Sequence, residues 1–199
     1  MTCDVRKKIA GLGIASAAAA LSPAMALAHP GIGPAAGFAA GLAHPLLGLD
    51  HLVAMLGVGL WAAQRGGRAL WAVPLAFVAV MALGGFLGAI GVGLPFVAPA
   101  IAASVLVLGV LIAAAVRMPL VASTLLAGGF ALFHGHAHGT EMPATAAAIA
   151  YGAGFVLTTA LLHGAGIGLG VLARKAGSER LFRVAGGATA VLGIALLIG

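Results

Sequence analysis

Two short stretches of this sequence hold most of the side chains that could bind a metal ion. They are the histidines and carboxylates of HPLLGLDH and FHGHAHGTE: His44, Asp50, His51, His134, His138 and Glu141. Imidazole nitrogens with few carboxylates suit nickel, cobalt, zinc or copper, whereas magnesium and calcium prefer cages of oxygen ligands. The residue types therefore indicate a site for a transition-metal ion, and they do not rank these four metals.

The spacing in FHGHAHGTE favours a helical metal site. His134 and His138 are one helical turn apart and share a face, a common way to hold a divalent transition metal, and Glu141 comes about one further turn along. His136 falls on the opposite side of the helix. Gly139 and the nearby Pro143 favour a helix end around this point, so Glu141 lies either on the stripe or just beyond the helix.

HPLLGLDH needs a distorted helix if its polar side chains are to meet. On a straight helix His44 and His51 would be about 10 Å apart along the axis, too far for one small ion. Pro45 lacks the N–H that would bond back to Gly41, and Gly48 follows closely, so we expect a kink or an unwound turn here. Without such a distortion, the stretch would make two neighbouring metal sites.

Three further side chains are weaker candidates for metal contact. His163 lies one turn after Thr159, but a lone histidine hydrogen-bonded inside a bundle is the commoner arrangement. His29 would add an imidazole near the start of the mature chain. Met55 could offer a thioether one turn after His51, although core packing is the favoured interpretation of this residue.

The composition places these residues in a membrane protein. Hydrophobic residues make up 62% of the 199 residues and charged residues only 7%. Long apolar runs without alternation are typical of membrane-spanning helices rather than of barrel strands, so we predict an all-α polytopic helix bundle in contact with membrane lipids. The formal charge of +6 is dispersed between apolar segments, which argues against a nucleic-acid partner.

Residues 1–28 resemble a cleavable export signal. Arg6, Lys7 and Lys8 precede a short apolar core, and Ala26-Leu27-Ala28 has the small-x-small pattern of a cleavage site. The alternative is an uncleaved first membrane helix. The only cysteine, Cys3, falls within this segment, so the predicted mature domain, residues 29–199, has no thiolate ligand.

The predicted mature domain contains six candidate spans. They are Ala35–Ala63, Ala69–Ile90, Phe96–Val116, Leu120–His138, Ala144–Ala173 and Leu181–Ile198, and each is long enough to cross about 30 Å of hydrocarbon. Small residues four apart predict close helix contacts at four places: Gly84/Gly88, Gly135/Gly139, Gly164/Gly168 and Gly166/Gly170.

The basic residues predict the orientation of these spans. Those of the predicted mature chain lie in or beside the first, third and fifth connections: Arg65, Arg68, Arg117, Arg174, Lys175, Arg180 and Arg183. The positive-inside rule places these connections in the cytoplasm, which agrees with a cleaved signal and a periplasmic N-terminus in the inner membrane. Both metal-binding stretches then fall in the outer half of the membrane, and His163 falls at or just past its middle.

The motif pair resembles the HupE/UreJ family of hydrogenase and urease accessory proteins. HPLLGLDHLVAML and FHGHAHGTE carry the resemblance, together with the opening HPGIGPAAGFAAGLAHP and the later LLHGAGIGLG. The resemblance implies a permease that supplies nickel, or in some members cobalt, to hydrogenase or urease maturation proteins. It implies metal roles for the six histidines and carboxylates of the two motifs.

A transporter that is not an enzyme is therefore the leading hypothesis, with Ni²⁺ as substrate and no tightly bound cofactor. The sequence has no nucleotide-binding loop of the G-x-x-x-x-G-K-[ST] type, so an ion gradient, the membrane potential or a partner would supply the energy. Two alternatives stay open. One is a transporter of cobalt, zinc or copper, and the other is a membrane-embedded metalloenzyme built around His134, His138 and Glu141.

Overall fold

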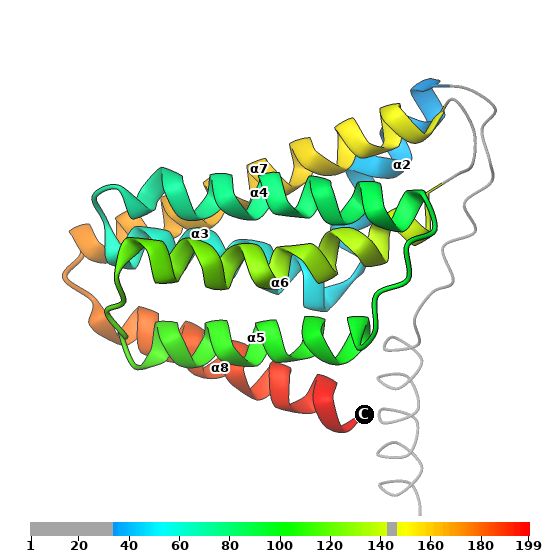
Figure 1. Ribbon diagram of the computed structural model, residues 1–199. Coiled ribbons are helices and arrows are strands. Elements are labelled where there is room, and N and C mark those ends of the chain that lie inside the picture. Colours follow the sequence, from blue (N-terminus) through cyan, green and yellow to red (C-terminus); the bar gives the residue numbers. More distant parts are fainter. Residues whose placement is uncertain (1–33, 143–146) are drawn as a thin grey trace, which may run out of the picture. The chain divides into compact units, whose positions relative to one another are not determined.

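The computed structural model describes residues 34–142 and 147–199, and these residues form helices joined by short turns (Figure 1). In chain order the helices are α2 (Pro34–Leu47), α3 (Leu49–Arg65), α4 (Ala69–Ala89), α5 (Val97–Ala113), α6 (Leu120–Thr140), α7 (Ala147–Lys175) and α8 (Glu179–Ile198). No strand occurs within the described ranges, so the predicted all-α class is confirmed for them. The predicted signal peptide and His29 lie outside the described residues.

Several of these helices can cross a membrane. α4, α6, α7 and α8 are each long and apolar enough, and α2 with α3 adds a fifth span if the bent pair is counted as one. α5 is apolar but has 17 residues, about 26 Å of helix, which is slightly short for a bilayer. The chain is thus a helical membrane protein, and the total of six spans stays a prediction.

The first predicted span is broken at Gly48. α2 and α3 meet at an angle of 83°, and Gly48 between them has an extended backbone with φ −95° and ψ 117°. Pro45 stays inside α2, so the predicted kink exists but lies three residues later than the proline. The carboxylate of Asp50 sits in the first turn of α3, where negative charge stabilises a helix N-terminus.

Glycines allow the helices to pack in close pairs. α4 packs on α6, α5 on α8, and α7 on both α2 and α3. A Cβ atom at Gly135 would collide with the carbonyl oxygen of Met81, and one at Gly139 with that of Gly85. Close approach is confirmed at three of the four predicted pairs. The prediction was wrong for Gly164/Gly168, because a Cβ at either position would meet nothing within 4 Å.

Gly135→Ala should destabilise the protein, because the added methyl group would push α6 away from α4. Overpacking of this kind costs about 1–3 kcal/mol. At about 2–4 °C per kcal/mol, we expect the thermal midpoint in detergent to fall by at least about 2 °C. Gly129→Ala on the same helix is the matched control, since its Cβ would meet nothing within 4 Å. Equal midpoints for the two variants would contradict the close α4–α6 contact.

The basic connections lie together at one end of the bundle. The α3–α4, α5–α6 and α7–α8 turns are on the same side in Figure 1, and the α4–α5 turn is at the opposite side. Two arginines tie this end together: Arg65 donates to the carbonyl of Met118, and Arg174 Nη1 donates to that of Ala63 at 3.0 Å. The bundle thus has one basic end, as the orientation argument requires.

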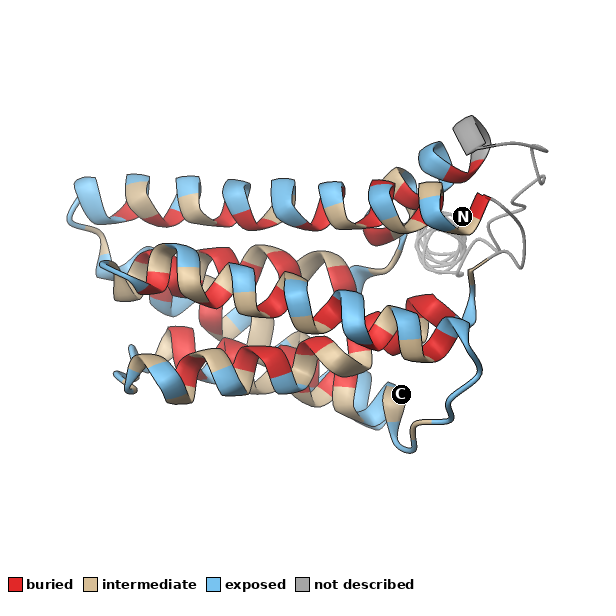
Figure 2. Cartoon of the chain, turned by 45° about the horizontal axis from the view of Figure 1, so that its top comes forward, coloured by how far each residue is buried: buried red, intermediate tan, exposed pale blue. Residues whose placement is uncertain are grey.

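The outer faces of the helices are apolar, as lipid contact requires. Figure 2 shows buried residues along the inward faces and exposed residues on the outward ones. Exposed side chains include Ile149, Leu125 and Val184. Because a soluble protein rarely exposes so many large apolar side chains together, this surface fits a bilayer.

Candidate metal site

Three of the predicted ligands come together at the end of the bundle opposite the basic turns. His44 of α2, His138 of α6 and Glu141 each offer a ligand atom, and these three atoms lie within 4.8 Å of one another. α6 ends at Thr140, so Glu141 lies just beyond the helix, one of the two placements left open by the sequence. There its Oε2 is 2.9 Å from His44 Nε2.

Glu141 is suited to attract a cation. The hydrogen bond from His44 lowers the pKa of Glu141, so this carboxyl group is ionised at neutral pH. Its side chain is 57% exposed, and that of His44 is 32% exposed. An ion arriving from solvent would therefore meet this carboxylate and imidazole first.

Four imidazoles continue from this point into the bundle, and we call them the histidine row: His44, His138, His51 and His134. Neighbouring ring centroids are 4.7 Å apart for His44 and His138, 4.2 Å for His138 and His51, and 4.7 Å for His51 and His134. Exposure falls to 0% at His134. The break at Gly48 makes this possible, because α2 and α3 can each turn a histidine toward His138.

Asp50 lies behind His51 rather than in the row. Its Oδ1 accepts hydrogen bonds from the His51 backbone N–H and from His51 Nδ1, both at 2.8 Å. Since a carboxylate can only accept here, Nδ1 carries the proton and Nε2 keeps a free lone pair. That Nε2 is buried without a hydrogen-bond partner. Asp50 therefore sets the tautomer of His51, as carboxylates commonly do behind metal-binding histidines.

Ser104 of α5 sets the tautomer of His134. The Ser104 hydroxyl donates to the carbonyl of Ile101 at 2.6 Å, and its oxygen lies 2.8 Å from His134 Nε2. With its only proton already donated, the hydroxyl must accept, so the proton of His134 is on Nε2. His134 Nδ1 is then an unprotonated, buried nitrogen without a partner, in a form ready to bind a metal.

Ser104→Ala should weaken metal binding by removing the acceptor for His134 Nε2–H. Loss of such a supporting partner typically costs about 10–100-fold in affinity. Titration calorimetry with nickel in detergent would measure the loss, and ¹⁵N spectra of labelled histidine would show the changed tautomer. Ser123→Ala is the control, because Ser123 is also buried but bonds to the Pro119 carbonyl. Unchanged affinity and unchanged ¹⁵N signals in Ser104→Ala would contradict this role.

The other two described histidines lie outside the row. His136 points away, as its spacing predicts, and its Nε2 donates to the carbonyl of Val92 at 2.7 Å. His163 of α7 is 2% exposed, and neither ring nitrogen has a partner. Phe77 lies between His163 and the row, with ring centroids 5.1 Å from His163 and 5.7 Å from His134.

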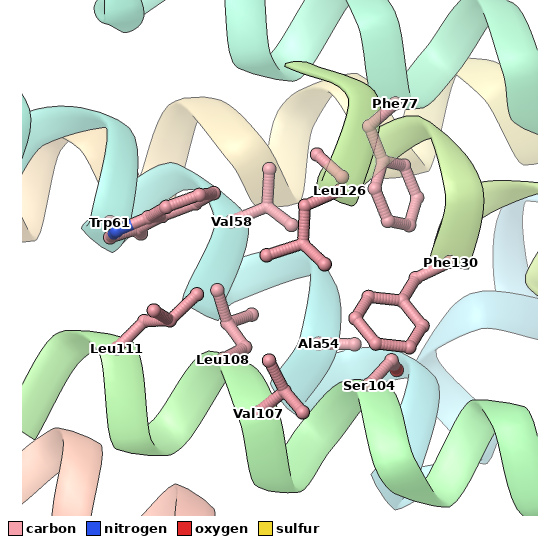
Figure 3. Close-up of a pocket in the computed structure, with 11 residues that line it drawn as sticks. Ala54, Val58, Trp61, Phe77, Ser104, Val107, Leu108, Leu111, Leu126 and Phe130 are labelled. Atoms are coloured by element: carbon pink, nitrogen blue, oxygen red, sulfur yellow. The ribbon is translucent and has the colours of Figure 1, made fainter. Parts of the chain in front are cut away.

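Toward the basic end, the bundle beside Ser104 is closed and apolar. A small cavity of about 20 Å³ lies here, with Ser104 and Trp61 among the lining residues in Figure 3. A single water could fit by volume, but the remaining lining side chains offer no convergent polar partners. Arg65 stacks over Trp61, with 5.7 Å from its guanidinium carbon to the ring centroid. Within the described residues, this cavity is therefore too small and too apolar to continue the row toward the basic end.

The sequence interpretation missed the residues that support and surround the row. Ser104 carries no metal-binding group of its own. The only feature of the sequence that could have pointed to it is that it is a lone polar residue in an apolar helix. Two aromatic residues beside the row were missed as well. The ring centroid of Phe155 is 4.1 Å from that of His138, and the ring centroid of Tyr151 is 5.7 Å from that of His44. Both come from α7, whose position beside α2 has no local signature.

Comparisons with known proteins cover most of this chain. A family model described as HupE / UreJ protein matches residues 17–196 of this chain. Protein HupE of Rhizobium leguminosarum bv. viciae is 49% identical over 182 residues, covering 92% of this chain and 95% of the relative. No solved structure matches. The matched range includes the whole histidine row and Glu141.

Proposed function

This chain belongs to the HupE/UreJ family, and from that premise we propose that it is a permease carrying Ni²⁺ across the inner membrane into the cytoplasm. The family is one of hydrogenase and urease accessory transporters for nickel or cobalt. We infer that the imported ion goes to hydrogenase or urease maturation proteins. The choice of nickel rests on the family and on the ligand chemistry together.

The observation that carries this proposal is the histidine row. It begins beside the exposed carboxylate of Glu141 and ends at His134, which has no exposed surface. Buried charges and polar groups in a membrane bundle are costly, and they usually mark a substrate or ion path. Imidazole nitrogens with one carboxylate and no thiolate favour a borderline transition metal such as nickel over calcium or magnesium.

The direction of transport follows from the orientation we propose. The basic end of the bundle faces the cytoplasm, since Arg65, Arg117 and Arg174 belong to connections at that end. Glu141 and His44 then face the periplasm, with six spans following a cleaved signal. An inside-negative potential would favour inward movement of a divalent cation by about 4.6 kcal/mol per 100 mV, twice the value for a single charge.

Purified protein in sealed vesicles provides the test. Uptake of nickel, cobalt, zinc and copper would be compared at a clamped potential, with protein-free vesicles as the control. We expect nickel uptake that saturates with concentration and rises as the interior is made more negative. Absence of uptake for all four ions would contradict the proposal. Metal-stimulated turnover of a substrate without any transport would instead support the metalloenzyme alternative.

A further inference from the structure

A group of electron-donor atoms lies deeper in the bundle than the histidine row. Met55 of α3, Met81 of α4 and Thr159 of α7 meet in one layer: the Thr159 hydroxyl oxygen is 3.4 Å from Met55 Sδ and 3.8 Å from Met81 Sδ. Exposure is 0% for Met55, 1% for Met81 and 0% for Thr159. Two thioethers and a hydroxyl from three helices thus converge on one buried point.

The Thr159 hydroxyl lies within hydrogen-bond distance of three acceptors, the Phe155 carbonyl and the two sulfur atoms, and can serve only one of them at a time. The Thr159 hydroxyl has one proton, and its strongest acceptor is the carbonyl oxygen of Phe155 at 3.0 Å. When this proton is donated to the Phe155 carbonyl, no hydrogen lies between the hydroxyl oxygen and the two sulfur atoms, and all three atoms have lone pairs available. Such a cluster is suited to a cation, and thioethers in particular favour soft or borderline transition metals.

His163 adds an imidazole one helical turn beyond Thr159. Both of its ring nitrogens are buried without a hydrogen-bond partner, although buried polar atoms normally have one. Its ring stands edge-on to Phe77, with 5.1 Å between centroids. Ordinary core packing explains a buried methionine, but it does not explain an imidazole with two unused nitrogens in the middle of a membrane bundle.

The register of the helices places this group directly after the row. Met55 is one turn beyond His51 on α3, toward the basic end, and His163 is one turn beyond Thr159 in the same direction on α7. These helices run parallel, since Gly59 packs against the backbone of His163, and Gly170, further along α7, packs against Ala63, further along α3. The order toward the basic end is therefore the row, the thioether layer and then His163.

We propose that Met55, Met81, Thr159 and His163 form an inner binding station for a soft or borderline transition-metal ion, which receives the ion from the histidine row. This inference rests on the proposed transport function and extends it past the histidine row and Glu141. A thioether and imidazole site would bind a divalent ion less tightly than the row with its carboxylate, so an ion would occupy it transiently while passing inward.

Selenomethionine labelling gives a direct test of contact. The described residues contain four methionines, so Met55→Leu/Met81→Leu removes the proposed pair and Met118→Leu/Met142→Leu is the matched control. Leucine has similar volume, and such exchanges are well tolerated in cores. With excess nickel, and with cuprous copper as a softer probe, X-ray absorption at the selenium edge should show a metal neighbour in wild type and control. The signal should vanish in Met55→Leu/Met81→Leu.

A metal neighbour that persists in Met55→Leu/Met81→Leu, or that is absent from the wild type with both probes, would overturn the inner station. Transport gives a second readout in vesicles. We expect the maximal nickel uptake rate of this double variant to fall by about tenfold while its KM changes by less than about twofold, because the outer ligands are intact. Wild-type rates in the double variant would contradict the inner station alone, whereas absence of uptake by the wild type would contradict the transport function itself.

Discussion

Replacing His138 with alanine is expected to abolish nickel uptake, because this imidazole links the two parts of the proposed site. Its ring lies 4.7 Å from that of His44 and 4.2 Å from that of His51. Both of its nitrogens are buried without partners in the protein. Since loss of a residue that only supports a ligand already costs about 10–100-fold, we expect loss of this ligand to lower uptake by about a hundredfold or more.

His136→Gln is the matched control for this experiment. His136 is on the same helix two residues earlier and is also buried, but it bonds to the Val92 carbonyl away from the row. Glutamine retains a donor for that carbonyl, so uptake should stay near the wild-type rate. Both variants would be matched for membrane expression before vesicle assays. Normal uptake by His138→Ala, or equal losses in the two variants, would contradict the central position of His138.

Glu141→Gln is expected to raise the nickel concentration needed for half-maximal uptake by about 10-fold or more, the scale of losing one group that supports a metal site. The carboxylate is the exposed negative charge beside His44, at 2.9 Å, and an amide of the same shape removes the charge that attracts the cation. The maximal rate should change less than the KM, because the buried part of the row is untouched. Initial uptake rates over a range of nickel concentrations would separate the two effects.

Glu179→Gln tests whether any lost carboxylate has this effect. Glu179 is the other glutamate in the sequence, and it lies exposed at the basic end, 3.8 Å from Arg183. Its replacement should leave the KM unchanged, because surface ion pairs of this kind contribute little and this one is remote from the row. A KM for Glu141→Gln within twofold of that for Glu179→Gln would exclude Glu141 from the first contact with the ion.

The local features of the site could be predicted because they depend on neighbouring residues. One-turn spacing put His134 and His138 on one face, and the same rule turned His136 away. The need for a bend in HPLLGLDH also followed from helix geometry. The position of the bend did not, since the missing N–H of Pro45 and the flexibility of Gly48 both permit one.

Contacts between distant helices could not be predicted in the same way. Neither Ser104 behind His134 nor Thr159 between two methionines has a sequence neighbour that reveals its partner. Each partner lies on another helix and depends on where glycines let backbones approach. Glycine spacing alone was also insufficient, because Gly164 and Gly168 match the packing pattern but face outward. Helix pairing is thus the information that the structure adds.

The pairing of α2 with α7 also bears on how the protein is made. Thr158 donates to the carbonyl of Leu42, 116 residues earlier, at 2.9 Å. At about 5–20 residues per second, a ribosome needs roughly 6–23 seconds to synthesise that interval. During this interval α2 and α3 have been synthesised but their partner helix α7 has not. Tyr151 and Phe155 of α7 can therefore pack beside the histidine row only when translation is nearly complete. An incomplete chain that lacks α7 does not have the complete metal site.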